Sequence, residues 1–332
     1  MTIPLDQQHL LRRAHGSLLL AACADLMAAP LHGRTTPEPA QIEVILRATP
    51  RLLVASPAAI QMVVLAEHLG ANGGRINDDV LAADLATEWP ADRPELSGTT
   101  TSRVLRAVAA GTRWWQIAPE VHHGQGSFGS VAAVRACAAG LVPGNGAAAA
   151  AALGRRSAGI THTHLLARDG AAATAAAVAL AAQAQPATPA DRYRFLSAVA
   201  AQMRTAEFRT ALRTVQTLVR HRSAPAETAA TLGADRTALR SVPAALTAFL
   251  RHCDDPAAAT RYALMMGGQT RTTAAIVGAI SGARHPEYTL AMPWRPDLMR
   301  LLRLRAAAAA LSAATGRRGD RWPGDHRTGQ GP

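Results

Sequence analysis

Residues 265–285 read MMGGQTRTTAAIVGAISGARH, and this stretch sets the fold class that we expect. Two glycines lead into a run with helical spacing, which predicts a helix over residues 272–282. A junction of this kind presents hydroxyl groups and backbone amides to a small ligand. Arg271 is unexpected at such a position, because the start of a helix already carries positive partial charge. We therefore expect an anionic partner for Arg271.

The composition favours an all-α fold. The chain has 332 residues, of which 48% are hydrophobic and only 4% aromatic. Much of the apolar content is alanine, the best helix former, in runs such as GAAAAAALG at 146–154. No strand-like alternation is evident. Helical spacing predicts helices over 8–29, 57–69, 100–118, 129–141, 168–184, 190–218, 240–252, 257–266, 272–282 and 297–314.

The domain organisation is simple. Glycine- and proline-rich segments separate the predicted helices without a clear shift in composition, which predicts a single domain over residues 1–315. Residues 316–332 read GRRGDRWPGDHRTGQGP and lack apolar periodicity, so we expect a disordered tail there.

The charge is strongly basic, with a formal net charge of +12, and all 35 basic side chains are arginine. Codon bias in a GC-rich genome accounts for such a preference. Recognition of phosphate also accounts for it, because a guanidinium group binds phosphate through two parallel hydrogen bonds. The arginines are scattered, so nucleic acid is not an expected partner.

The cysteines and the N-terminal segment suggest neither a disulfide framework nor a membrane anchor. Cys23, Cys137 and Cys253 are far apart and show no metal-binding spacing. Residues 17–30, SLLLAACADLMAAP, follow two arginines as a signal sequence would, but they contain Asp25. We interpret this segment as a buried core helix and expect a cytoplasmic protein without a membrane segment.

Five polar segments interrupt the apolar helices and are the candidates for one composite site. They read LMAAPLHGR at 26–34, VASPAAIQM at 54–62, HHGQGSFGS at 122–130, GITHTH at 159–164 and GGQTRTT at 267–273.

In this order the segments resemble those of the ADP-ribosylglycohydrolase family, which includes ADP-ribosylarginine hydrolases. The resemblance covers about residues 10–285. It implies an all-α orthogonal bundle of many helices, removal of ADP-ribose from protein side chains, and a di-magnesium centre. The matching residues are Gly16, Asp25, Ala29, Pro30, Gly126, Ser127, Gly129, Arg135, Thr161, His162, His164, Gly267, Gly268, Thr270, Thr272, Gly278 and Gly282.

The departures from the family pattern concern the metal ligands. Ser56, Pro57, Ala58 and Ala59 stand where the family has T-D-D-T, and residues 269–272, QTRT, stand where it has D-T-D-T. The resemblance thus implies that all four metal-binding aspartates are absent, and His32 replaces an early glutamate. Magnesium requires hard oxygen ligands, chiefly carboxylates, so we expect neither a metal nor another cofactor.

Three functions remain open from the sequence. The first is a binding module for ADP-ribose, a nucleotide or another anionic ligand. The second is a metal-independent enzyme in which His32 and Asp25 are catalytic and Arg271 holds the substrate. The third is a scaffold that binds a protein partner. Asp25 is expected to pair with Arg271 or with His32. The predicted ligand-binding residues are Ser56, Gly126, Ser127, Phe128, Gly129, His162, His164, Gln269, Arg271 and Thr272.

Overall fold

The computed structural model describes residues 5–34, 37–47, 55–89, 99–184, 191–290 and 297–314, and the predicted tail at 316–332 lies outside these residues. Within them all regular elements are helical, so the prediction of an all-α fold is confirmed. The α-helices are α1 (Leu5–Ala28), α2 (Pro39–Arg47), α3 (Pro57–Ala71), α4 (Asp78–Thr87), α5 (Thr99–Ala109), α6 (Trp114–Glu120), α7 (Val131–Arg135), α8 (Ala147–Gly159), α9 (Leu165–Gln183), α10 (Arg192–Ala200), α11 (Ala206–Arg220), α12 (Pro225–Leu232), α13 (Ala238–Arg251), α14 (Pro256–Met265), α15 (Thr270–Arg284) and α16 (Leu298–Ala313). Three 3-10 helices complete the described part, namely η1 (Ala29–Leu31), η3 (Ala136–Leu141) and η4 (Pro286–Leu290).

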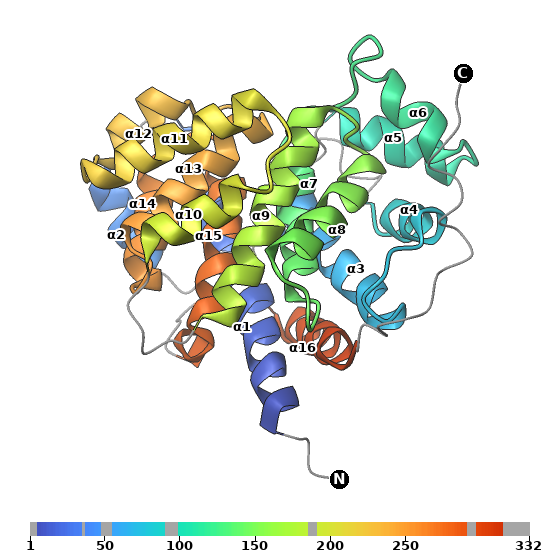
Figure 1. Ribbon diagram of the computed structural model, residues 1–332, viewed down its shortest axis with the longest axis horizontal. Helices are drawn as coiled ribbons and strands as arrows, with labels where there is room; N and C mark the ends of the chain where they lie inside the picture. The colour runs from blue at the N-terminus through green and yellow to red at the C-terminus, as the bar shows by residue number, and fades with distance from the viewer. Residues whose placement is uncertain are drawn as a thin grey trace.

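The centre of the molecule is an antiparallel pair of helices, α1 and α15, that come from opposite ends of the chain (Figure 1). Glycines let their backbones touch. A Cβ on Gly282 would overlap the carbonyl oxygen of Gly16, and a Cβ on Gly278 would lie 2.5 Å from the carbonyl oxygen of Leu20. The Ser17 hydroxyl adds a hydrogen bond of 2.8 Å to the Ala279 carbonyl. This contact therefore fixes the register of the two helices.

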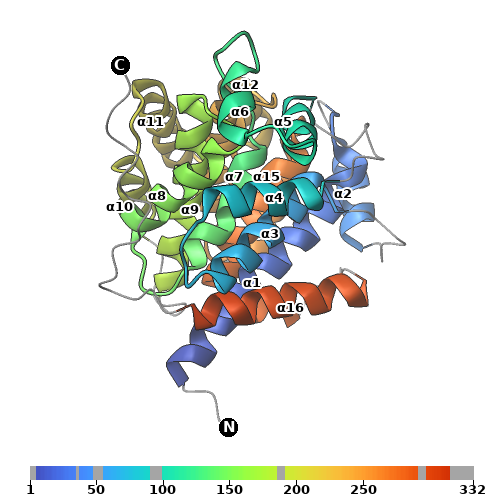
Figure 2. The same cartoon turned by 90° about the vertical axis from the view of Figure 1, so that its right-hand side faces the viewer.

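The remaining helices pack around this pair. Helix α9 lies beside α15 and consists largely of buried alanine, so that α8, η3 and α13 also approach it closely. Helix α16 lies across α1 and α3 (Figure 2). The guanidinium of Arg303 on α16 holds Glu67 of α3 at 2.7 Å and Glu88 at 2.9 Å.

Two of the predicted helices are divided in the structure. The range 100–118 is broken between α5 and α6, where Gly111 has a φ of 93°. The range 190–218 is broken between α10 and α11, because the buried Asp169 carboxylate accepts hydrogen bonds from the amides of Arg204 and Thr205 at 2.9 and 2.7 Å. Four helices that the spacing did not predict are α2, α4, α8 and α12.

Two helices are long and apolar enough to cross a membrane by length and composition alone, Asp6–Leu31 and Leu165–Gln183. Both are mostly buried within the structure, which is the environment of core helices. The interpretation of residues 17–30 as a buried helix is confirmed for the residues of α1, which are all buried from Ser17 to Ala28.

The close contact of α1 and α15 predicts that an alanine at position 282 destabilises the protein more than an alanine at position 159. Gly282→Ala forces a methyl group against backbone atoms that cannot rotate away, so we expect a loss of about 3 kcal/mol, the upper end of ordinary overpacking costs. Gly159→Ala at the end of α8 is the matched control, because a Cβ there meets no atom within 4 Å. Urea denaturation should show Gly159→Ala at least as stable as wild type, and equal losses in both variants would contradict the account.

Candidate functional site

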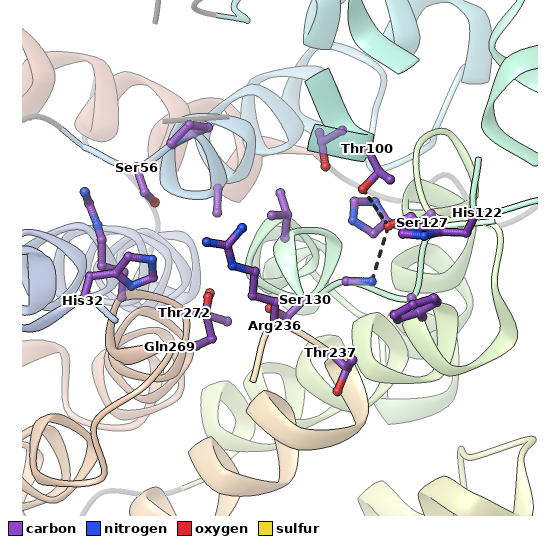
Figure 3. A pocket seen from close by; sticks show the side chains of 18 of the residues that line it. His32, Ser56, Thr100, His122, Ser127, Ser130, Arg236, Thr237, Gln269 and Thr272 are labelled. Atoms are coloured by element: carbon purple, nitrogen blue, oxygen red, sulfur yellow. Dashed lines mark hydrogen bonds between the residues drawn. The ribbon is translucent and has the colours of Figure 1, made fainter. Parts of the chain in front are cut away.

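A cavity of about 370 Å³ lies where five helices begin (Figure 3). The helices are α3, α5, α7, α13 and α15, and each contributes a residue from its N-cap or first turn. These residues are Ser56, Thr100, Ser130, Thr237 and Gln269. Because the first turn of a helix has backbone N–H groups without intrahelical acceptors and the positive end of its dipole, the lining is rich in hydrogen-bond donors.

The side chains that line the cavity include cations but, within the described residues, no anion. Among the described lining residues there are two arginines, Arg236 and Arg271, three histidines and no carboxylate. Within the described part of the chain there is also no group of three His, Cys, Asp or Glu residues that could hold a metal ion.

Asp25 of α1 and Arg271 of α15 form a buried ion pair behind the cavity wall. The guanidinium donates from Nε to Oδ1 at 3.0 Å and from Nη2 to Oδ2 at 2.7 Å. The backbone amide of Ser56 donates to the same Oδ2 at 2.8 Å. The Asp25 side chain is fully inaccessible, while that of Arg271 is 13% exposed. The predicted pairing of Asp25 with Arg271 is confirmed, but Asp25 does not line the cavity, so a direct catalytic role for it conflicts with the geometry.

His32 follows η1 and lines the same side of the cavity. The neighbouring backbone is tied to the glycine turn before α15, since the Gly33 amide donates to the Gly268 carbonyl at 2.9 Å and the Gly268 amide donates to the Arg34 carbonyl at 2.7 Å. Desolvation lowers the pKa of His32, and the charges of Arg271 and Arg236 lower it further against the opposing effect of Asp25. The imidazole is therefore neutral at pH 7.

The glycine-rich segment contributes Ser127, Phe128 and Gly129 to the cavity. Phe128 also packs against His122, with ring centroids 4.7 Å apart. Gly126 does not line the cavity, contrary to expectation. It has a φ of 76°, and a Cβ there would overlap the Thr163 hydroxyl, so the turn and this close contact require a glycine.

The two histidines of THTH have different environments. His162 is 1% exposed and lines the cavity, and burial lowers its pKa to about 3. His164 does not line the cavity, contrary to expectation. Its Nδ1 accepts from the Leu166 amide at 3.2 Å and so caps α9, and its ring meets Phe128 edge-on.

The positions that are expected from the sequence to depart from the family pattern converge in space. Pro57 and Ala58 from the start of α3 and Gln269 and Arg271 from the start of α15 all line the cavity. Of the predicted residues, the cavity includes His32, Ser56, Ser127, Phe128, Gly129, His162, Gln269, Arg271 and Thr272.

Residues of the loop before α13 were missed from the sequence. Thr237 is the N-cap of α13, and its place ahead of an apolar run is a signal that could have revealed it. Arg236 beside it has no sequence signal, because it is one arginine among many. Trp89, Thr100 and Thr101 complete the opposite wall and were also missed.

The chain belongs to the ADP-ribosylglycohydrolase family, whose family model matches residues 6–321. A solved structure of an "ADP-ribosylglycohydrolase-related protein complex" superimposes with a TM-score of 0.63 at 20% sequence identity. The match covers 93% of this chain and 99% of the other, so the two share the fold. None of the curated proteins matches the sequence.

The Asp25–Arg271 pair predicts a strong energetic coupling. Arg271→Gln leaves a carboxylate buried without its counter-charge, which costs about 3–5 kcal/mol in comparable cases. In the double variant Asp25→Asn, Arg271→Gln no charge is left buried, so we expect it to recover most of that loss in urea denaturation. The single variant Asp25→Asn completes the comparison. If the double variant lost as much stability as the two single variants together, the pair would not be coupled.

His162 predicts a dependence of stability on pH. Its pKa in the folded protein is lowered to about 3, so below pH 6.5 the unfolded chain binds a proton that the folded protein does not. Acidification therefore destabilises the fold, by about 2 kcal/mol between pH 6.5 and 5 for this single group. Denaturation curves at several pH values should show a shallower loss for His162→Gln, and parallel losses in the two proteins would contradict the assignment.

Proposed function

We propose that this protein is a metal-free binding module that holds a phosphate-bearing ligand, such as ADP-ribose or a nucleotide, in the cavity. One observation carries the proposal. The described lining combines the exposed Arg236 with the starts of five helices, and it contains no carboxylate, while the second arginine, Arg271, is paired with the buried Asp25 behind it. Such a surface attracts anions and repels cations.

The side chains at the positions of the family's metal ligands support a site without magnesium. At the four positions where the family pattern has aspartates, this chain has Pro57, Ala58, Gln269 and Arg271. Only the Gln269 amide among them offers an oxygen, and Arg271 places a cation beside it. The nearest buried carboxylate, Asp25, already accepts three hydrogen bonds on its two oxygens. A hard dication bound by several carboxylates does not fit this set.

The size and the apolar part of the cavity support a ligand with both a charged and a flat portion. The volume of about 370 Å³ is within the range of small-molecule pockets. Phe128 and Val131 form an apolar wall, and the exposed His122 ring stacks on Phe128. A ribose or a base contacts such a wall while the phosphate faces the cationic side.

The geometry favours binding over the alternative of metal-independent catalysis. His32 is neutral and accessible, as a general base requires, but its proposed partner Asp25 has no exposed oxygen. A single imidazole without a second catalytic group gives weaker support than the donor-rich lining gives to binding.

Thermal unfolding of the purified protein tests the proposed function. ADP-ribose at a hundredfold excess over its Kd should stabilise the protein by about 2.7 kcal/mol and raise Tm accordingly. Adenosine, which has no phosphate, should give a smaller shift, and Mg²⁺ alone should give none. A large shift with Mg²⁺, or release of ADP-ribose from an ADP-ribosylated protein in its presence, would contradict the proposal.

A further inference from the structure

The two arginines of the cavity differ in whether the guanidinium group is paired with a carboxylate of the protein. Arg271 directs two hydrogen bonds inward to Asp25 and is 13% exposed. Arg236 is exposed, and its side chain reaches into the middle of the cavity (Figure 3). Within the part of the chain that the structure describes, the Arg236 guanidinium has no hydrogen bond or ion pair. Its charge acts on His32, whose pKa it lowers.

The backbone holds Arg236 in a fixed place. The Arg236 carbonyl accepts from the Ser130 amide at 3.0 Å, and the Ala238 amide donates to the Phe128 carbonyl at 3.0 Å. Gly129 and Thr237 form an isolated antiparallel bridge between these bonds. The carboxylate next in sequence, Asp235, accepts from the Thr237 amide and hydroxyl at 2.8 and 2.6 Å, so it serves as a local cap.

A second donor lies on the other side of Gly129. The buried Thr161 hydroxyl accepts from Arg135 Nη2 at 3.0 Å, and His162 Nδ1 at 2.8 Å is the one acceptor that the described residues offer for its hydrogen. This network assigns the proton of the neutral imidazole to Nε2. His162 Nε2 abuts Gly129, since a Cβ there would lie 3.4 Å from it, and no described protein group accepts its proton.

We propose that Arg236 is the counter-ion of the ligand's phosphate and that His162 Nε2–H is a neutral second donor, whereas the charge of Arg271 is balanced by Asp25. This inference rests on the proposed function and names the residues that select its ligand. A guanidinium presents two parallel N–H groups that match two oxygens of a phosphate. The ligand class that we assign on this basis, together with the proposed function, is a phosphate monoester or diphosphate.

Calorimetric titration of the full-length protein with ADP-ribose, inorganic phosphate and adenosine tests the assignment. Arg236→Gln should weaken binding of ADP-ribose and phosphate at least tenfold and leave adenosine binding unchanged. Arg236→Lys should be intermediate, because it keeps the charge but loses the paired donors. Arg220→Gln on α11 is the matched control with the same change in charge, and it should bind as wild type does.

The outcomes separate the two proposals. If wild type binds ADP-ribose and Arg236→Gln binds it equally well, the assignment of Arg236 is wrong and the proposed function stands. If wild type binds neither phosphate-bearing probe, the proposed function is wrong and the assignment is wrong with it. Thermal unfolding of Arg236→Gln without ligand should match wild type, because the described structure gives this side chain no internal partner.

Discussion

The close approach of α1 and α15 is the constraint on which the site depends. Gly16 contacts Gly282 and Leu20 contacts Gly278, which sets the antiparallel register of the two helices. In this register Asp25, near the end of α1, lies beside Arg271, at the start of α15. The ion pair thus depends on a backbone contact that three glycines allow. Because the Asp25 carboxylate also accepts from the Ser56 amide, the start of α3 is held to the same pair. Helices from three parts of the chain are thereby aligned around one cavity.

This arrangement explains how a cation can stand at the start of a helix. The dipole of α15 and the charge of Arg271 repel each other, and the buried carboxylate of Asp25 compensates both. The pair is neutral as a unit, so the positive character of the cavity comes from Arg236 and from the helix starts. The neutral state of His32 follows from its partial burial, which lowers its pKa, and from the same cationic environment, in which protonation would add a further cation.

The sequence was sufficient for the fold class and for the convergence of distant motifs. Pro57, Ala58, Gln269 and Arg271 were singled out from two segments, and they line one cavity. The sequence could not distinguish residues that face the ligand from residues that support the site. Gly126 and His164 belong to the expected motifs, yet one packs against Thr163 and the other caps α9. Arg236 was missed because its position depends on backbone pairing with residues 128–130, which no local pattern records.

A crystal structure of the protein grown with ADP-ribose and Mn²⁺ tests the central claim most directly, because manganese has an anomalous signal and occupies magnesium sites. The account predicts phosphate oxygens within hydrogen-bond distance of the Arg236 guanidinium, an intact Asp25–Arg271 pair, and no anomalous peak in the cavity. A manganese peak near Ser56 and Thr272, with Arg271 displaced from Asp25, would contradict it.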